Sequence, residues 1–435
     1  MTIPPRRRFR PAVLLAFALL AVPLLGLPPA TDLTALAFAD DGDGGDGGAG
    51  GGGGGGAGGD GGWEPDYDVV DTAPDGAPET FIANEILALD PSPAALRRAT
   101  AAGATVIERI RAARLSLQVV RLRLPPGLDA RTAREILSER DPRTFDLHHL
   151  YRLAQPAEAA CSGDVCAPLR LLKWPQDTRE CGRGQSIGVV DTAVEARHPA
   201  LAGAELRQRR FVGDDQQAAT AEHGTAVAAL LVDRPDSGFP GLLPRARLFA
   251  AAPFYALASG SATADAAGLV KSIDWLLSQG VQVIGMSLAG PGNRVLEAAV
   301  ERAAAKGVVI AAAAGNGGRN APPAYPAALE RVLGVTAIST DGRIYWRANQ
   351  GDYVDYALPG VNLWTADLGG GGKARSGTSF AVPFMVAFVS QSLAQRSAAP
   401  EAIFRGGAGE VVDLGAPGRD PVFGWGQPRF QGRCP

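Results

Sequence analysis

Histidine and cysteine are scarce in this chain, which has four of each among 435 residues. An excess of either charge is also absent, because 42 Lys and Arg oppose 45 Asp and Glu and leave a formal net charge of −3. Such a balance gives no electrostatic reason to expect a nucleic-acid partner. Disorder of the whole chain is excluded as well, since 46% of the residues are hydrophobic and only 20% are charged. The 56 glycines cluster without a period of three, which excludes a collagen-like chain.

A hydrophobic run long enough to span a membrane is missing from the N-terminal region. The apolar stretch Ala12 to Leu27 has 16 residues and contains Pro23, whereas a membrane span needs roughly 20. Four arginines between residues 6 and 10 precede it, and Ala37-Phe38-Ala39 offers a small-x-small cleavage site. We therefore predict that residues 1–39 are a cleaved export signal, that the protein is secreted or periplasmic, and that it has no stable membrane span. A retained anchor is the alternative.

The four cysteines are Cys161, Cys166, Cys181 and Cys434. An even number in an exported chain favours disulfides, and four cysteines allow three connectivities. A short pairing of Cys161 with Cys166 would leave Cys181 and Cys434 to join the two ends of the C-terminal part. A zinc site is the poorer alternative, because no histidine lies near the Cys-x4-Cys pair.

Composition divides the rest of the chain into three parts. Residues 40–63 consist almost entirely of Gly, Asp and Ala, which cannot offset the entropy of ordering and so predict a flexible linker. Residues 64–160 predict a small ferredoxin-like α+β domain with the order strand, helix, strand, strand, helix, strand. Its elements are expected at Phe81–Leu89, Pro93–Ala102, Ala104–Ile110, Leu115–Leu124, Asp129–Glu139 and Phe145–Leu153.

Residues 161–435 alternate between short apolar strands and helices. This alternation predicts an α/β domain with a largely parallel sheet flanked by helices. Strands are expected at Ser186–Val190, Val281–Ser287 and Val308–Ala313, and helices at Ala226–Val232, Ala266–Leu277, Val295–Ala305 and Phe380–Ala394. In such a sheet, an active site gathers at the carboxyl ends of the strands.

Three polar residues stand at the ends of these elements in a pattern that suits acyl-transfer chemistry. Asp191 follows an apolar strand, His223 opens a helix, and Ser379 stands where another helix begins, with Pro383 expected in its first turn. A serine at a helix N-terminus has backbone N–H groups beside it for a developing oxyanion. A histidine must take the proton of the serine, and a carboxylate must orient the imidazole.

The chain offers few candidates for the general base. His148 and His149 belong to the small domain, and His198 follows Asp191 too closely, so that His223 remains.

The scarcity of histidine also excludes another class of hydrolase. The segment Gly285-Met286-Ser287-Leu288-Ala289 nearly fits the nucleophile elbow of α/β-hydrolases, but that fold requires a histidine after the serine, and none follows.

The three segments resemble the catalytic motifs of the subtilisin-like serine proteases, or subtilases, and the likeness extends over about residues 174–435. The matching motifs are Asp191-Thr192, His223-Gly224-Thr225-Ala226-Val227-Ala228 and Gly377-Thr378-Ser379-Phe380-Ala381-Val382-Pro383. The resemblance implies a serine endopeptidase in which Asp191 orients, His223 is the general base and Ser379 is the nucleophile. The segment Ala313-Ala314-Gly315-Asn316 resembles the oxyanion segment of the family, so Asn316 would donate its side-chain amide.

The resemblance also implies how a substrate binds. Protein or peptide substrates would pair as an added strand with an edge formed by Ser287, Leu288, Ala289 and Gly290. Ala314 and Gly315 would line the same site. Ala289 stands where the family has a glycine, which predicts a narrower primary specificity pocket. No cofactor and no metal is expected to be required; calcium is common in relatives, but no calcium site is recognisable in the sequence.

The small domain resembles the propeptides of subtilases, which assist folding and then block the active site. Its last strand would lead into the catalytic groove, with cleavage expected between about Leu153 and Trp174. The protein would then be an autoprocessed zymogen whose own propeptide is an intramolecular inhibitor. The alternative function is a catalytically inactive relative that binds peptides in the same groove.

Overall fold

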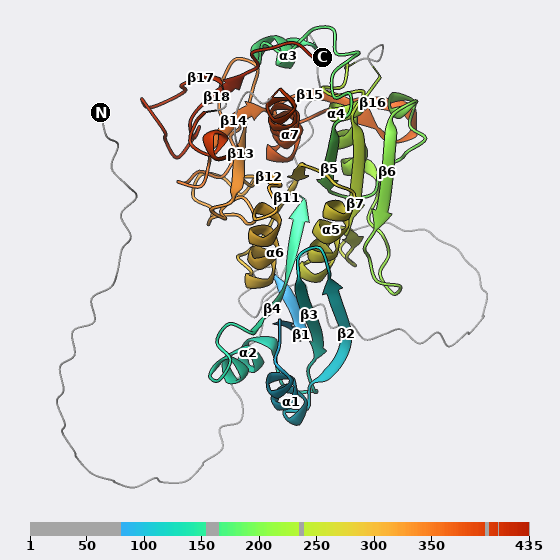
Figure 1. Cartoon of the computed structure of the whole chain (residues 1–435), viewed down its shortest axis with the longest axis vertical. Helices are drawn as coiled ribbons and strands as arrows, with labels where there is room; N and C mark the ends of the chain where they lie inside the picture. The colour runs from blue at the N-terminus through green and yellow to red at the C-terminus, as the bar shows by residue number, and fades with distance from the viewer. Residues whose placement is uncertain (1–79, 154–164, 235–238, 396–399, 408, 435) are drawn as a thin grey trace, which may run out of the picture. The chain divides into compact units, whose positions relative to one another are not determined.

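A computed structural model describes residues 80–153, 165–234, 239–395, 400–407 and 409–434 (Figure 1). The predicted export signal, the glycine-rich linker and Cys161 lie outside these residues. All the described residues belong to one compact unit, Glu64–Pro435. No helix in the described ranges is long and apolar enough to cross a membrane.

The small N-terminal domain has the predicted order of elements, and its ferredoxin-like fold is confirmed. Its strands form an antiparallel sheet in the order β2-β3-β1-β4, with two helices on one face. The elements are β1 (Phe81–Leu89), α1 (Pro93–Ala101), β2 (Thr105–Ala112), β3 (Leu117–Arg123), α2 (Ala130–Ser138) and β4 (Phe145–Leu153). Ser92 caps α1, because its side chain accepts a hydrogen bond from the N–H of Ala95 at 3.1 Å.

The α/β domain is built on a fully parallel sheet, which confirms the predicted fold class. The strand order is β14-β13-β12-β10-β5-β7-β6. These strands are β5 (Ser186–Val190), β6 (Glu205–Arg210), β7 (Arg247–Ala252), β10 (Val283–Met286), β12 (Val309–Ala313), β13 (Val332–Ile338) and β14 (Tyr356–Pro359). The central strands are buried throughout, as expected for strands covered on both faces.

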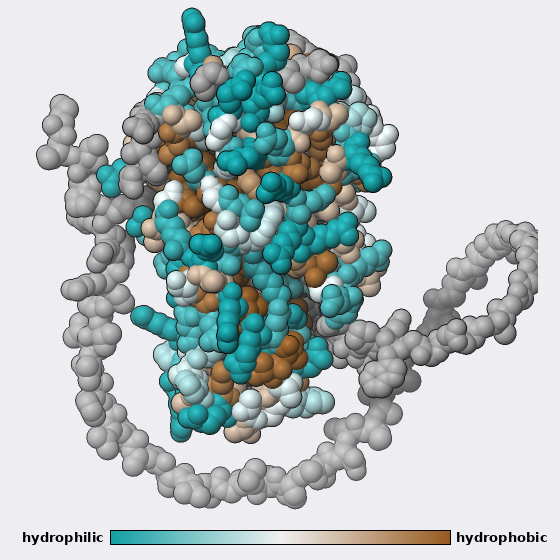
Figure 2. Space-filling model, turned by 45° about the vertical axis from the view of Figure 1, so that its right-hand side comes forward, coloured by the Kyte–Doolittle hydropathy of each residue, from teal (hydrophilic) through white to brown (hydrophobic). Residues whose placement is uncertain are grey.

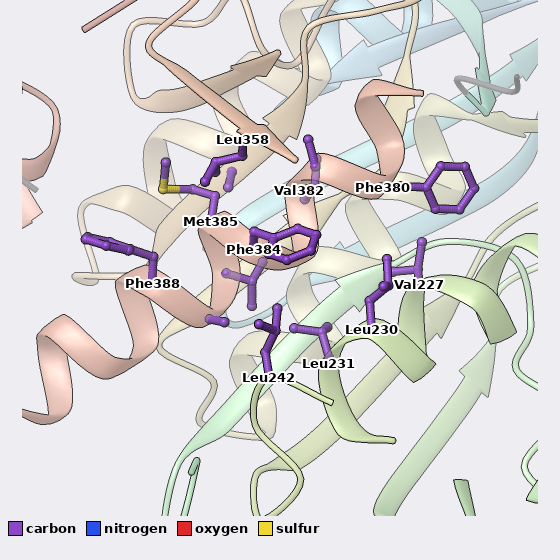
Figure 3. Packing of buried hydrophobic residues seen from close by; sticks show 14 of the residues in the cluster. Val227, Leu230, Leu231, Leu242, Leu358, Phe380, Val382, Phe384, Met385 and Phe388 are labelled. Atoms are coloured by element: carbon purple, nitrogen blue, oxygen red, sulfur yellow. The ribbon is translucent and has the colours of Figure 1, made fainter. Parts of the chain in front are cut away.

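Helices cover both faces of the parallel sheet. One face carries α4 (Glu222–Val232) and α7 (Thr378–Ala394), and the other carries α5 (Ala266–Ser278) and α6 (Arg294–Ala304). Both α4 and α7 are apolar almost all round, and their side chains pack against each other (Figure 3). Leu230 and Leu231 on α4 belong to the same buried cluster as Phe380 and Phe384 on α7, and this cluster holds together the two helices whose first turns carry candidate catalytic residues.

Shorter elements complete the α/β domain. Its remaining strands are β8 (Tyr255–Ala256), β9 (Ala262–Asp265), β11 (Leu288–Ala289), β15 (Leu363–Asp367), β16 (Gly371–Arg375), β17 (Glu410–Val412) and β18 (Gln427–Arg429). Its short helices are α3 (Ala167–Leu171), η1 (Pro199–Leu201), η2 (Leu368–Gly370) and α8 (Pro400–Ile403). A disulfide joins Cys181 to Cys434 across a sequence separation of 253 residues, so the ends of this domain are covalently linked, one of the pairings considered from the sequence.

The two domains are joined through β4. This strand pairs with β1 in the small domain, and its second half runs between β9 and β11 of the α/β domain. Both of these contacts are antiparallel: Leu150 to Arg152 pair with β9, and Arg152 and Leu153 pair with β11. The small domain thus extends its last strand into the α/β domain, immediately beside the strand that follows β10.

The face shown in Figure 2 is mostly hydrophilic and is interrupted by small hydrophobic areas. Among the described residues, Trp346 is the most exposed of the large hydrophobic side chains, at 76%. The stability of the fold therefore resides in the two buried layers that cover the parallel sheet rather than in its surface.

Candidate active site

Asp191 and His223 form a buried pair at the carboxyl end of the parallel sheet. Asp191 directly follows β5, and His223 is the second residue of α4. The Oδ1 atom of Asp191 lies 2.7 Å from Nδ1 of His223, and the two residues are only 1% and 4% exposed. Because an ionised carboxylate can only accept, this contact places the proton on Nδ1 and leaves the lone pair of the neutral imidazole on Nε2. No described residue is a hydrogen-bond partner of Nε2.

A glycine allows the imidazole to approach the aspartate. The backbone N–H of Gly224 donates to Oγ1 of Thr192 at 2.8 Å, which draws the first turn of α4 onto the loop after β5. A Cβ atom on Gly224 would lie 2.4 Å from the carbonyl oxygen of Thr192. A larger residue would therefore push the start of α4, and His223 with it, away from Asp191.

Ser379 lies in the first turn of α7, where the sequence predicts the nucleophile. The preceding Gly377 has a φ of 147°, a conformation that L side chains rarely adopt and that turns the chain sharply into the helix. Phe380 stacks beside the imidazole of His223, with the ring centroids 5.1 Å apart. The packing of α7 on α4 therefore brings the first turn of α7, which contains Ser379, to the side of the helix that carries His223.

The expectation that Pro383 lies in the first turn of α7 is wrong. The helix begins at Thr378, so Pro383 is its sixth residue and cannot donate to the carbonyl of Ser379, four residues earlier. That carbonyl instead accepts a hydrogen bond from Oγ of Ser287 at 3.2 Å. The Oγ of Ser379 in turn donates to the carbonyl of Ser287 at 3.1 Å. Ser287 thus satisfies the group that the proline leaves unbonded, and it ties the end of β10 to the candidate nucleophile.

Asn316 is held in one orientation by its neighbours. Its Oδ1 accepts from the backbone N–H of Thr378 at 3.1 Å and from the hydroxyl of Thr378 at 2.9 Å. These two donors identify the oxygen of the amide, so its Nδ2 points elsewhere, and Nδ2 has no partner among the described residues. A buried amide donor beside the first turn of α7 is the kind of group that can stabilise an oxyanion.

The predicted substrate-binding residues lie around this point. Leu288 and Ala289 form β11, and they pair with Leu153 and Arg152 of β4. Gly290 lies under the ring of Tyr151, because a Cβ atom there would be 2.4 Å from Cδ1 of the tyrosine.

The other two predicted substrate-binding residues are Ala314 and Gly315, which lie between β12 and Asn316. The carbonyl of Ala314 accepts from the hydroxyl of Tyr353 at 2.8 Å, and the N–H of Gly315 donates to Oγ1 of Thr378 at 3.2 Å. An extended segment thus occupies the peptide-pairing edge, and the segment beside Asn316 is braced by Tyr353 and Thr378.

A buried charged cluster at the domain junction was not singled out from the sequence. His148 of β4 is fully buried, with Nδ1 3.0 Å from Oε2 of Glu85 and Nε2 3.2 Å from Oδ1 of Asp265. Burial alone would lower the pKa of His148, but the charge of Asp265 and the contact with Glu85 outweigh it and raise the pKa. Only the tertiary structure brings these groups together, so no local signal in the sequence marks them.

No group of three or more His, Cys, Asp or Glu side chains in the ranges described has an arrangement that could hold a metal ion.

A parallel α/β sheet with a buried carboxylate–imidazole pair beside a serine at a helix start is the architecture of a serine peptidase. The model of the "Subtilase family" matches residues 182–425, which is more than half of the chain. The chain therefore belongs to the subtilase family of subtilisin-like serine proteases, as the sequence motifs predict.

Known relatives support this assignment. The chain is 35% identical over 206 residues to thermitase from Thermoactinomyces vulgaris, a match that covers 46% of this chain and 72% of thermitase. It is 30% identical over 259 residues to the minor extracellular protease Epr from Bacillus subtilis, covering 58% of this chain and 39% of Epr.

A solved structure shares the fold. The crystal structure of fervidolysin from Fervidobacterium pennivorans, a keratinolytic enzyme related to subtilisin, has a TM-score of 0.68 and 19% identity. The match covers 80% of this chain and 60% of that chain. This chain therefore spans less than two thirds of both Epr and fervidolysin.

Proposed function

We propose that the protein is a secreted serine endopeptidase that hydrolyses peptide bonds through an acyl-enzyme and matures from a zymogen by its own activity. The observation that carries the proposal is the buried hydrogen bond between Asp191 and His223, next to the helix turn that holds Ser379. Membership of the subtilase family supports the class of reaction.

In the proposed first step, Oγ of Ser379 attacks the carbonyl carbon of the scissile bond while Nε2 of His223 takes the hydroxyl proton. Asp191 stabilises the imidazolium that forms and keeps the ring in place. The oxyanion of the tetrahedral intermediate accepts hydrogen bonds from Nδ2 of Asn316 and from the backbone N–H of Ser379. The orientation of Asn316, fixed through its Oδ1, supports this role.

In the second step, the carbon–nitrogen bond breaks and His223 gives the proton to the leaving amine. The acyl group stays on Oγ of Ser379 as an ester. A water molecule then attacks the ester with His223 again as base, and the acid product leaves as the serine regains its proton. The two halves balance as hydrolysis of one peptide bond by one water, with no redox or organic cofactor.

The way in which β4 pairs with β9 and β11 supports a mode of substrate binding. We propose that protein and peptide substrates take the place of this strand and pair with the same two edges. The small domain would then be an intramolecular inhibitor that blocks the groove with its own chain. Cleavage is proposed after Leu153, within the segment that leads to Trp174, and export is proposed to depend on residues 1–39.

The test is to produce the wild type and Ser379→Ala side by side and to follow chain mass over time. We expect the wild type alone to lose roughly its first 155 to 175 residues and to react covalently with a fluorophosphonate probe. Ser390→Ala is the matched control, because it removes a hydroxyl from the same helix at a site that hydrogen-bonds Gln185 instead. Equal processing of Ser379→Ala, or a wild type that the probe does not label, would refute the proposal.

A further inference from the structure

A buried arginine links the segments that carry the candidate base and nucleophile. Arg375 is the last residue of β16, four positions before Ser379. Its Nη2 lies 2.8 Å from Oε1 of Glu222 and 2.6 Å from Oδ1 of Asp367. Glu222 is the first residue of α4 and directly precedes His223, whereas Asp367 ends β15.

Burial distinguishes this ion pair from the exposed pairs of the molecule. The side chain of Arg375 is 9% exposed, while the two carboxylates remain 41% and 33% exposed. In contrast, Arg179 and its partner Asp177 are 72% and 61% exposed, and such pairs contribute little. A buried guanidinium whose Nη2 is shared between two carboxylates is restricted in its motion, and it fixes the distance between the elements that carry them.

The strand β15, which carries Asp367, is itself anchored to its surroundings. The carbonyl of Asp367 lies 2.7 Å from Nε2 of His198, and β15 is further tied to α4 because the hydroxyl of Thr365 donates to the carbonyl of Ala226 at 2.7 Å. Arg375 therefore connects the start of α4 to a hairpin whose other strand is already fixed to the same helix. Displacement of Arg375 would move the chain that leads into Gly377 and Ser379.

Given the proposed peptidase function, we infer that Arg375 and Glu222 are a positioning pair for the reaction. The pair sets the approach of Ser379 to His223, and Arg375 neutralises the carboxylate adjacent to the catalytic histidine. Neither residue acts on the substrate. Asp191 contacts the imidazole directly, and Glu195 lies beside α4, where its backbone N–H donates to Oγ1 of Thr225.

The two charges have opposite effects on His223, and this gives the inference a distinctive signature. Loss of Arg375 leaves the Glu222 carboxylate unpaired, which stabilises the imidazolium and moves the acid limb of the kcat/KM profile to higher pH. Loss of the Glu222 charge removes a negative charge beside His223 and leaves the guanidinium paired with Asp367 alone, so the same limb moves to lower pH. We expect shifts of about 0.5 pH unit in each direction, since Glu222 directly precedes His223 in α4 and its carboxylate is partly solvated.

The experiment measures kcat and KM between pH 5 and 10 with a quenched fluorescent peptide that carries the sequence of residues 148–157. Wild type, Arg375→Met, Arg375→Lys, Glu222→Gln and the double variant Glu222→Gln/Arg375→Met are matured with a trace of tagged wild-type enzyme, which is then removed. The matched control is Arg179→Met, which breaks an exposed pair. The melting temperature of each variant is recorded alongside.

We expect Arg375→Met to lower kcat at least tenfold with KM changed less than twofold, because misalignment of reacting groups affects the chemical step. The double variant should return the acid limb to within 0.2 unit of the wild type, and Arg375→Lys should keep the limb in place while lowering kcat. If Arg375→Met does not fold, Glu222→Gln and Arg375→Lys carry the test.

Unchanged pH profiles in the charge variants, or a rise in KM at constant kcat, would overturn the positioning role while the wild type remains an active peptidase. A wild type that neither cleaves the peptide nor reacts with a fluorophosphonate overturns the proposed function, and the positioning role with it. The two failures are therefore told apart by the wild type alone.

Discussion

The core of the α/β domain and the junction with the small domain are held together by different kinds of contact. In the α/β domain, apolar helices cover both faces of a parallel sheet, and a disulfide closes the ends of the chain. At the junction, buried charged and polar groups accompany the apolar contacts. There His148 lies between Glu85 and Asp265, and Lys271 pairs with Glu108.

Carboxylates of both domains add further polar contacts at the junction. Asp274 of α5 accepts the backbone N–H of Arg114 at 2.6 Å and that of Leu115 at 3.1 Å. Asp146 of β4 accepts the N–H of Arg294 at 2.8 Å, which caps the start of α6. Such contacts specify one docking geometry but depend on charge state, whereas burial of apolar surface in the α/β domain does not. The docking of the small domain is therefore more sensitive to pH than the packing of the α/β domain.

The largest effect is expected from a change that abolishes the chemistry and leaves both regions intact. Asp191→Asn keeps the size of the side chain but removes the charge that orients and stabilises His223. We expect kcat to fall about 10⁴-fold, as it does when the aspartate of a serine protease triad is replaced. Asp177→Asn is the exposed control. Single-turnover hydrolysis of a peptide amide measures the loss, and a loss of less than tenfold would remove Asp191 from the triad.

The disulfide of the α/β domain gives this domain a source of stability that the junction lacks, and it can be removed by mutation. Replacing Cys181 and Cys434 together by serine removes a cross-link that closes a loop of 253 residues. We expect the free energy of unfolding to fall by about 3–5 kcal/mol, since the unfolded chain gains entropy. Urea denaturation of the Ser379→Ala background, followed by tryptophan fluorescence, measures this loss. A change below 1 kcal/mol would show that the disulfide does not constrain the unfolded chain.

Given the proposed release of the small domain, we expect the charged junction to make that release dependent on pH. The pKa of His148 is raised in the docked state, so its contribution is complete below the ordinary pKa of histidine and is lost as pH rises through the raised value. After processing, activity should therefore appear about tenfold faster at pH 9 than at pH 6. In His148→Gln, release should be fast and nearly independent of pH in this window.

His149 provides the matched control for this pH dependence. Burial lowers the pKa of His149 to about 4, so it is neutral throughout the same window. Its Nδ1 lies 2.9 Å from Nδ2 of Asn293, at the start of α6. His149→Gln should therefore keep the pH dependence of release. If His148→Gln kept it as well, the cluster around His148 would not be its source.

Sequence patterns predicted the elements of both regions closely, because apolar periodicity marks buried strands and helices wherever they occur. The strands Phe81–Leu89, Phe145–Leu153 and Ser186–Val190 have the predicted bounds. The start of α4 was predicted less accurately. The helix begins at Glu222, four residues before the predicted start at Ala226. Gly224 lies in its first turn, and the low helix propensity of glycine hides that turn from pattern analysis.

What the sequence could not predict are contacts between distant segments. Pro383 lies beyond the first turn of α7 because Ser287, far away in the chain, bonds the carbonyl that the proline leaves without a donor. Arg375 with Glu222, and His148 with Asp265, are likewise pairs of residues that lie far apart in the sequence and meet only in the fold. Local propensity carries no information about such pairs, since each side chain is also compatible with an exposed position.

The smallest effect is expected at the edge where the two regions meet, and it tests how that edge selects a substrate. Ala289 pairs with Arg152 of β4 and bears a methyl group where the family has a glycine. We expect the wild type to prefer modest-sized or flexible side chains at the cleaved position. Ala289→Gly should raise kcat/KM for Phe over Leu by about tenfold, the low end of what one methylene in a pocket contributes. Profiling a peptide library with both enzymes measures the ratio. Ala298→Gly, at a partly buried position of α6, controls for loss of a methyl elsewhere. A strong preference for Phe or Tyr in the wild type would contradict the prediction, because the extra methyl would then not narrow the pocket.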